Sequence, residues 1–239
     1  MKVAVCLSGL TRSFSWCWPL IERYLVRPYS ADVFIHTWDI DHGGARSSCL
    51  YDSGILESFP DGRTKTEFID QEVAPADYEI ECFNDWAQAN NFRHNAQSMY
   101  YGIWKAFEIK RAYAAEKNIS YDLVIRCRMD YWFHAFMREN EIKDSLENNK
   151  LYCCMPGNKP NPFEFVTDSF GFGPNDLMDT YSQTWVDQNN KPCMFEAANE
   201  MALDVQLKEN NISYEWSKMP YLITNEWGPS RVLAWGDFD

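Results

Sequence analysis

The chain has 239 residues, of which 46% are hydrophobic and 24% are charged, as expected for a globular protein built as a single domain. Its formal net charge of −13 opposes binding to nucleic acid, because a phosphate backbone requires a basic face. No uncharged apolar stretch reaches the roughly 18 residues that a membrane span needs, and the N-terminus lacks the pattern of a signal peptide. We therefore expect a cytoplasmic protein without a transmembrane segment.

The first predicted strand is the apolar run at residues 3–7, which a turn of small residues joins to a helix over residues 18–26. Ligands of open α/β sheets bind beyond the carboxyl ends of the strands, so the turn with Ser8, Gly9 and Arg12 is a natural place for a nucleotide. The turn has neither the glycine motif of dinucleotide-binding folds nor a P-loop. From the turn alone, a tight turn without a ligand is the preferred interpretation of Gly9.

A second apolar strand, over residues 31–39, also runs into polar and aromatic groups at its carboxyl end, among them His36 and Trp38. Taken singly, each of these residues is more commonly part of a core. From about residue 40 to residue 95 the sequence loses clear periodicity, and one or two short elements are expected there, including a strand near residues 78–82.

The most convincing predicted helix covers residues 95–117, where apolar residues recur at spacings of three and four. One face of this helix is expected to pack on the sheet. Gln97 and Tyr101 lie near its start, where they can reach a ligand beside the strand ends.

The run Tyr121–Tyr131 is predicted to be a buried strand that ends in a charged site. Side chains alternate along a strand, so Arg126, Arg128 and Asp130 share one face. The arginines can bind phosphate or neutralise Asp130. Asp130 can hold a divalent cation against a diphosphate or form an internal ion pair with an arginine, and the spacing gives both interpretations equal weight.

In the remaining chain, a mixed polar segment is expected at residues 131–149, a strand at 150–155, an exposed loop at 156–162 and an alternating segment at 163–173. Two helices are expected at residues 174–186 and 195–209, and strand-like residues at 213–224. Asp168 precedes two glycines, where a backbone can approach a sugar closely, and it is the first candidate general base for an attacking hydroxyl. Glu200 is the second candidate catalytic carboxylate, although a first-turn carboxylate favoured by the helix dipole is its preferred interpretation.

Hydrolase chemistry has little support in the sequence. There is no Gly-x-Ser-x-Gly motif, no local Cys-His signature and no HExxH among the four histidines.

Three segments, Val5–Phe14, Ala31–Trp38 and Tyr121–Asp130, resemble small glycosyltransferase-like proteins of microbes and large viruses. These proteins resemble GT-A enzymes, which bind a nucleotide sugar on a Rossmann-like α/β sheet. The resemblance covers the first 130 residues and extends to Val166–Gly171. It implies a GT-A-like, Rossmann-type α/β fold with a mixed, mostly parallel sheet flanked by helices.

The resemblance also implies a single domain over residues 1–239, with a nucleotide-binding part at about 1–135 and an acceptor-side part at about 136–239. The turn at Ser8–Arg12 and the strand end at His36–Asp39 would line the nucleotide pocket. Arg128 stands at the first acidic position of the Asp-x-Asp metal motif of GT-A enzymes. An arginine can itself neutralise a leaving diphosphate, so the resemblance leaves a requirement for Mn²⁺ or Mg²⁺ open.

The expected function is transfer of a sugar from a nucleotide-diphosphate sugar, the donor substrate, to a hydroxyl of a glycan or glycoconjugate acceptor. The alternatives are a non-catalytic nucleotide- or carbohydrate-binding protein of the same fold and a nucleotide-sugar hydrolase. The candidate residues fall into three groups. They are Ser8, Gly9, Arg12, His36, Trp38, Gln97, Tyr101, Arg126 and Arg128 for the donor, Asp130 for a metal, and Asp168 and Glu200 for catalysis.

Overall fold

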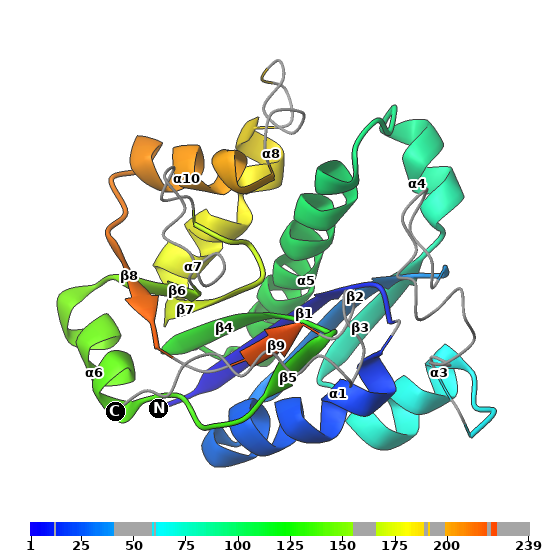
Figure 1. Ribbon diagram of the computed structural model, residues 1–239, viewed down its shortest axis with the longest axis horizontal. Coiled ribbons are helices and arrows are strands. Elements are labelled where there is room, and N and C mark those ends of the chain that lie inside the picture. The colour runs from blue at the N-terminus through cyan, green and yellow to red at the C-terminus, as the bar shows by residue number, and fades with distance from the viewer. Residues whose placement is uncertain are drawn as a thin grey trace.

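The computed structural model describes residues 1–11, 13–40, 59, 61–154, 166–188, 191, 199–218 and 221–223, and only the backbone of residues 199–200 and 221–223. Within these residues, seven strands form one sheet in the order β3-β2-β1-β4-β7-β6-β8 (Figure 1). Their bounds are β1 Val3–Gly9, β2 Asp32–Trp38, β3 Asp77–Glu81, β4 Leu123–Arg128, β6 Leu151–Cys154, β7 Phe170–Pro174 and β8 Tyr214–Ser217.

Most neighbouring strands of this sheet run parallel. The pairs β1–β2, β1–β4, β2–β3 and β6–β8 are parallel, whereas β7 is antiparallel to both β4 and β6. The expectation of a mixed, mostly parallel sheet is therefore confirmed. Strands from both halves of the chain share this sheet, and a separate antiparallel pair joins β5 (Tyr131–Phe133) to β9 (Tyr221–Ile223).

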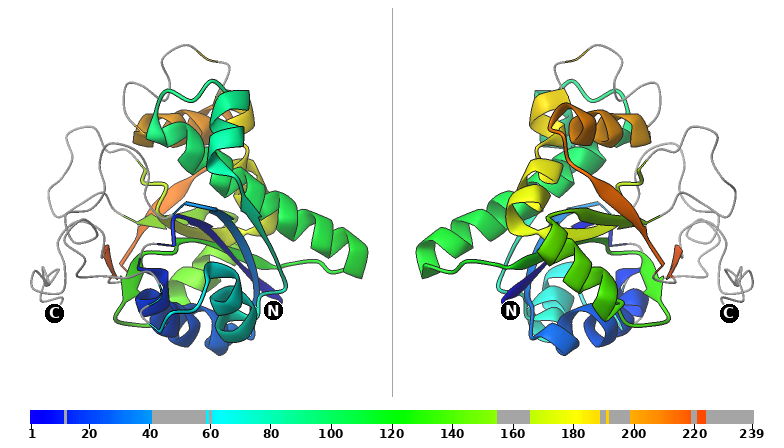
Figure 2. Two further views of the ribbon diagram at one scale, coloured as in Figure 1. Left: turned by 90° about the vertical axis from the view of Figure 1, so that its right-hand side faces the viewer. Right: turned by 90° about the vertical axis from the view of Figure 1, so that its left-hand side faces the viewer.

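Helices cover both faces of the sheet (Figures 1 and 2). The bounds are α1 Phe14–Ile21, α3 Lys65–Phe68, α4 Phe83–Ala89, α5 Asn95–Lys117, α6 Glu139–Asn148, α7 Asn175–Ser182, α8 Thr184–Gln188 and α10 Asn199–Glu209. Helices α1, α3 and α6 pack on one face, and α5, α7, α8 and α10 pack on the other. Single π-helical turns at residues 22–26 and 69–73 continue α1 and α3.

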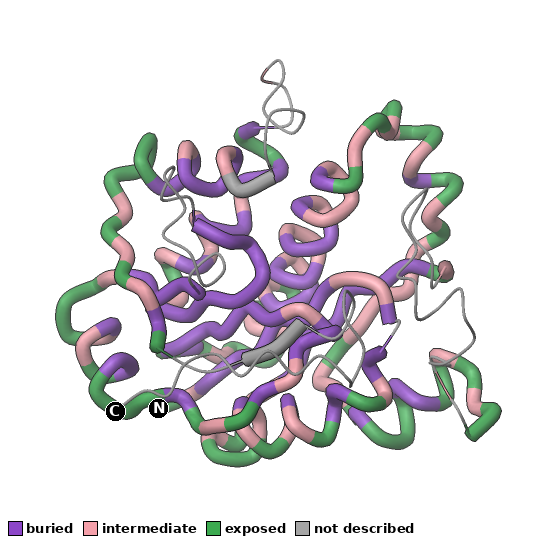
Figure 3. The backbone as a smooth tube through the Cα atoms, in the orientation of Figure 1, coloured by how far each residue is buried: buried purple, intermediate pink, exposed green. Residues whose placement is uncertain are grey.

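Each face of the sheet has its own hydrophobic core. Val3, Val5 and Leu7 of β1 face α1, whereas Ala4 and Cys6 face α5, so the strand alternates between two cores and is buried on both sides (Figure 3). Burial on both faces is typical of parallel strands flanked by helices. Each fully buried aliphatic side chain stabilises the fold by about 1.5–3 kcal/mol.

The connections change sides of the sheet between β1 and β4. The segments that link β1 to β2 and β2 to β3 carry α1 and α3, whereas the segment that links β3 to β4 carries α5 on the opposite face. The order β3-β2-β1-β4 matches the first four strands of doubly wound nucleotide-binding sheets, in which ligands bind where the strand order reverses. This topology places the expected ligand site at the carboxyl ends of β1 and β4.

Several elements agree with the sequence and some do not. The strands at residues 3–7, 31–39 and 78–82 and the helix at 95–117 are confirmed. The segment 131–149, expected only to be mixed and polar, contains β5 and α6. The sequence did not predict α6, because two of its three buried positions hold the polar residues Glu141 and Ser145 and the apolar periodicity of a helix is therefore weak. The carboxylate of Glu141 accepts hydrogen bonds from Ser217 Oγ at 2.8 Å and Lys218 N at 3.0 Å.

The other helices also differ in their bounds. The helix expected at residues 18–26 begins earlier, at Phe14, and the one expected at 174–186 is two helices, α7 and α8. The loop expected at residues 156–162 lies outside the described residues. Among the described helices, none combines the length and apolarity that a membrane span requires.

Candidate functional site

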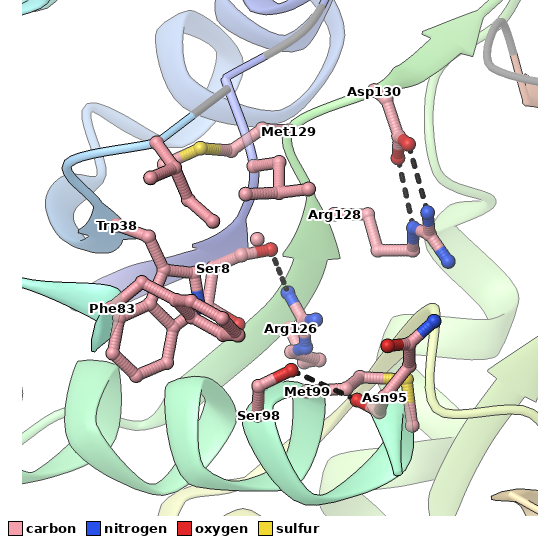
Figure 4. Close-up of a pocket in the computed structure, with 13 residues that line it drawn as sticks. Ser8, Trp38, Phe83, Asn95, Ser98, Met99, Arg126, Arg128, Met129 and Asp130 are labelled. Carbon is pink, nitrogen blue, oxygen red and sulfur yellow. Dashed lines mark hydrogen bonds and ion pairs between the residues drawn. The ribbon is translucent and has the colours of Figure 1, made fainter. Parts of the chain in front are cut away.

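A cavity of about 230 Å³ lies where the strand order reverses, at the carboxyl ends of β1 and β4 (Figure 4). Its lining comes from the ends of β1, β2 and β4 and from helices α4 and α5. The lining residues are Ser8, Gly9, Leu10, Trp38, Ile40, Phe83, Asn95, Ser98, Met99, Arg126, Arg128, Met129 and Asp130.

The parallel register of β1 and β4 brings residues that are 120 positions apart into one wall of the cavity. Ser8 lies opposite Arg128, and Cys6 lies opposite Arg126. Gly9 follows with φ of 134°, a backbone conformation that other residues rarely adopt, and its carbonyl accepts a hydrogen bond from Thr37 Oγ1 at 2.8 Å. The turn after β1 thereby presents backbone to the cavity.

One end of the cavity, which we call the charged end, consists of Arg126, Arg128, Asp130, Asn95 and Ser98. Arg128 binds Asp130 through two hydrogen bonds of 2.8 Å, from Nε to Oδ1 and from Nη2 to Oδ2. This is the internal ion pair expected from the sequence as one of two alternatives. Burial acts to lower the pKa of Arg128, but the charge and hydrogen bonds of Asp130 outweigh it and raise that pKa, so the guanidinium stays charged.

Arg126 is the most deeply buried charge at this end, with 1% of its surface exposed. Its Nη1 donates to the carbonyl oxygens of Ser8, at 3.5 Å, and Cys127. Its Nε has no partner among the described residues. A buried donor without a partner is costly, so Arg126 retains capacity to bind an anion or another acceptor.

Helix α5 adds to the positive character of the charged end. Its first turn contributes Asn95 and Ser98 to the lining, and the N-terminus of a 23-residue helix carries partial positive charge. The charged end holds two guanidinium groups and one carboxylate, whereas the protein as a whole is acidic. The local field therefore favours an anionic ligand despite the net charge.

The opposite end of the cavity, which we call the aromatic end, consists of Trp38 and Phe83, whose ring centroids lie 5.4 Å apart. In Figure 4 both rings lie on the left, and the Arg128–Asp130 pair lies on the right. Behind the aromatic end, Trp86 and Tyr101 pack on Trp38 at centroid distances of 4.9 and 5.7 Å. The cavity therefore presents an apolar, stackable surface at one end and charges at the other.

His36 and Tyr101 do not line the cavity. Both bind Glu81 at the end of β3, His36 Nε2 at 2.8 Å from Oε2 and Tyr101 Oη at 3.1 Å from Oε1. Burial lowers the pKa of His36, although Glu81 acts in the opposite direction, so the ring is neutral near pH 7 and donates Nε2–H to the carboxylate. His36 Nδ1 has no partner among the described residues. Helix α5 passes close to it at Gly102, where the Cβ of any larger residue would lie 3.2 Å from Nδ1.

Gln97 also serves the fold. Its Oε1 accepts hydrogen bonds from the backbone N–H groups of Arg93, at 2.7 Å, and His94, at 3.1 Å, and His94 Nδ1 accepts from Ala96 N. This capping box begins α5 and does not face the cavity. A ligand role for His36, Gln97 and Tyr101 stays a prediction that the geometry does not favour.

Asp168 lies beside the charged end without lining it. Ser169, which follows Asp168 in the chain, accepts a hydrogen bond from Arg128 N at its carbonyl oxygen, at 3.0 Å. Tyr181 Oη donates to the carbonyl oxygen of Asp168 at 3.1 Å. Asp168 is 6% exposed, and its Oδ2 has no partner among the described residues. Arg12 and the side chain of Glu200 lie outside the described part of the chain.

The donor set at Asp130 does not fit a divalent cation. Both carboxylate oxygens accept hydrogen bonds from Arg128, and the described residues contain no group of three or more His, Cys, Asp or Glu side chains that could hold a metal ion. The role of Asp130 as a metal ligand therefore stays a prediction, and the function proposed below uses no metal.

Some lining residues were not anticipated from the sequence. Asn95, Ser98 and Met99 stand at i, i+3 and i+4 of α5, a spacing that puts them on one face of the helix. This spacing in the predicted helix could have indicated that all three residues face the same cavity. Phe83 lies in the segment without periodicity, where nothing indicated a ligand-facing ring.

The described residues form a doubly wound α/β fold with a cavity at the reversal of strand order, and two arginines and one aspartate lie at its charged end. Residues 1–229 match the family described as Domain of unknown function (DUF7796), and the chain belongs to that family. We found no significant match to any curated protein.

Proposed function

We propose that this protein is a glycosyltransferase that moves a sugar from a nucleotide-diphosphate sugar to a hydroxyl of a glycan or glycoconjugate. The observation that carries the proposal is the cavity at the carboxyl ends of β1 and β4, with arginines at one end and aromatic rings at the other. A nucleoside diphosphate has the matching division into a stackable base and an anionic diphosphate.

In this proposal the charged end binds the diphosphate. Arginine binds phosphate oxygens through paired N–H groups, and Arg126 has a buried Nε without a partner among the described residues. The bonds from Arg128 to Asp130 use two of its N–H donors and leave others for the ligand. Both guanidinium groups would stabilise the charge that develops on the departing diphosphate, which is the main chemical demand of the reaction.

The aromatic end would hold the nucleobase. Stacking of a base on an aromatic side chain contributes about 1–3 kcal/mol and tolerates different bases. Trp38 and Phe83 are the aromatic residues among the described lining and are the candidates for this contact.

Asp168 is the candidate general base for the acceptor hydroxyl. A base needs an oxygen that is not already hydrogen-bonded, and the buried Asp168 Oδ2 has no partner in the described part of the chain. We expect Asp168→Asn to lower turnover by roughly 10²- to 10⁴-fold, the usual contribution of a general base, and to leave nucleotide affinity within about twofold. Steady-state kinetics beside calorimetric titration measures both, and unchanged turnover would remove Asp168 from the mechanism.

Calorimetry with UDP and GDP, each with and without Mn²⁺, tests the proposal. We expect a dissociation constant between about 1 µM and 1 mM for one of them, the range in which enzymes bind substrates. The corresponding UDP- and GDP-sugars are then offered with a glycan acceptor, and transfer is followed by mass spectrometry. Absence of binding by both nucleotides would contradict the proposal.

A non-catalytic nucleotide- or carbohydrate-binding protein is the second candidate, and the Arg128–Asp130 pair favours it. By the resemblance, this pair would stand where GT-A enzymes carry two carboxylates, and its single carboxylate is in an ion pair with Arg128. Binding of a nucleotide without transfer to any acceptor would support this candidate, and loss of donor without an acceptor product would indicate a hydrolase.

A further inference from the structure

We propose that Glu81 is a positioning residue that fixes the ring of Trp38 in the orientation that receives the nucleobase. This inference rests on the proposed function and adds to it a residue outside the cavity. Glu81 is the last residue of β3 and is 23% exposed by its side chain.

A single carboxylate binds two of the rings that contact Trp38. Glu81 Oε2 lies 2.8 Å from His36 Nε2, and Oε1 accepts from Tyr101 Oη at 3.1 Å. The His36 ring meets the indole of Trp38 edge-on, with centroids 4.9 Å apart, and the Tyr101 ring stacks on it at 5.7 Å with an interplanar angle of 23°. Phe83 and Trp86 also contact the indole, but His36 and Tyr101 are bound to one carboxylate, so the positions of these two rings are coupled.

The backbone of the same residue supports the end of β2. Trp38 and Glu81 are register partners in the parallel pair β2–β3, and Glu81 O accepts a hydrogen bond from Asp39 N at 2.8 Å. Glu81 thus connects β2, β3 and α5 around Trp38, which is the tryptophan of the cavity lining within the described residues.

The charges that face Glu81 come from the same strand and from α5. Lys105 Nζ lies 3.9 Å from Glu81 Oε1 but only 3.2 Å from Glu79 Oε2. Glu79 precedes Glu81 by two residues on the same face of β3, and no hydrogen bond of Glu79 to either ring is present. Glu79 is therefore a matched control, with the same charge and the same lysine but without the hydrogen bonds to the two rings.

The test measures affinity for two probes, the nucleoside diphosphate that the wild-type protein binds (UDP or GDP) and inorganic diphosphate. Glu81→Ala is expected to weaken nucleoside diphosphate binding on the order of tenfold, the scale of a disturbed aromatic–base stack. Inorganic diphosphate, which probes the charged end alone, is expected to keep its affinity. Glu79→Ala is expected to change neither value.

Tyr101→Phe serves as the second variant, because it removes only the hydroxyl that Glu81 accepts and keeps the stacked ring. It is expected to weaken nucleoside diphosphate binding about threefold, as loss of one hydrogen bond does. It keeps the inference testable if Glu81→Ala does not fold, which circular dichroism would reveal.

The outcomes separate this inference from the proposed function. Nucleoside diphosphate binding that is unchanged in both variants would overturn the role of Glu81 and leave the proposed function standing. An equal loss for both probes would show a general structural effect and would also overturn it. If the wild-type protein binds neither nucleotide, the inference and the proposed function fail together.

Discussion

The two ends of the cavity are built in different ways. At the charged end the groups that would meet the ligand bind one another or the backbone: Arg128 holds Asp130, and Arg126 holds carbonyl oxygens of β1 and β4. At the aromatic end the ring of Trp38 is held from behind, by His36 and Tyr101 through Glu81. A substitution at the charged end therefore changes ligand binding directly, whereas the aromatic end can also be changed by a residue that no ligand touches.

Arg126→Met is expected to produce the largest change in binding. Hydrogen bonds to charged groups contribute about 1.5–3 kcal/mol each, so loss of the guanidinium should weaken nucleoside diphosphate binding on the order of 100-fold. Stability should stay within about 1 kcal/mol, because replacing a buried charge by an apolar side chain of similar volume removes its desolvation cost. Calorimetry and urea denaturation measure the two effects. A large loss of stability with little loss of affinity would make Arg126 a structural residue.

Arg128→Met is expected to affect both stability and binding. Removal of one partner of a buried ion pair costs about 3 kcal/mol, here at the low end because Arg128 is partly exposed. Adding Asp130→Asn should recover most of this loss, because the uncompensated carboxylate is gone, while nucleoside diphosphate affinity stays about tenfold below the wild type. Denaturation of Arg128→Met, of the double variant and of Asp130→Asn, which is the matched control, tests this. Recovery of affinity in the double variant would show that Arg128 does not bind the ligand.

At the aromatic end, Phe83→Leu is expected to weaken nucleoside diphosphate binding by about threefold to tenfold, because the aromatic face is lost and the apolar volume is kept. Inorganic diphosphate should bind as it does to the wild type. An equal effect on both probes would contradict the division of the cavity into two ends.

The smallest expected effect is on the pH dependence of stability, and it belongs to the support of the aromatic end. Burial, opposed by Glu81, lowers the pKa of His36 in the folded protein. The unfolded chain protonates this histidine near pH 6.5 and the folded protein only at a lower pH, so between these two pKa values the free energy of unfolding falls as the pH falls, by at most about 1.4 kcal/mol per pH unit. His36→Gln, which keeps a donor for Glu81, should flatten the urea-denaturation curve against pH between about pH 7 and pH 5. Equal slopes for both proteins would contradict it.

The parts of the site that follow from local patterns were predictable from the sequence. An apolar run that ends in polar residues indicated the carboxyl ends of β1, β2 and β4, and alternation along a strand put Arg126 and Arg128 on one face. Whether Asp130 would meet an arginine or a cation could not be decided from spacing, because the same three residues serve either arrangement.

The parts that depend on distant contacts were not predictable. Glu81 binds partners 45 residues before it and 20 residues after it, and nothing near it in the sequence indicates either. Gln97 lies at a position where a residue can face the ligand or cap the helix, and the histidine that completes its capping box is an unusual N-cap. Phe83 reaches the cavity only because β3 places α4 beside the end of β2.

The pairing of Val3 with Leu123 has a consequence for how the protein is made. Strand β4, which supplies both arginines, pairs with β1 in the sheet. During synthesis, more than half of the chain must therefore be made before β1 can pair with β4. Contacts between segments so far apart in sequence form slowly. The ability to bind a ligand should therefore form late in folding. A nascent chain that stops before residue 123 lacks Arg126, Arg128 and Asp130, so it should not bind a nucleotide through the charged end.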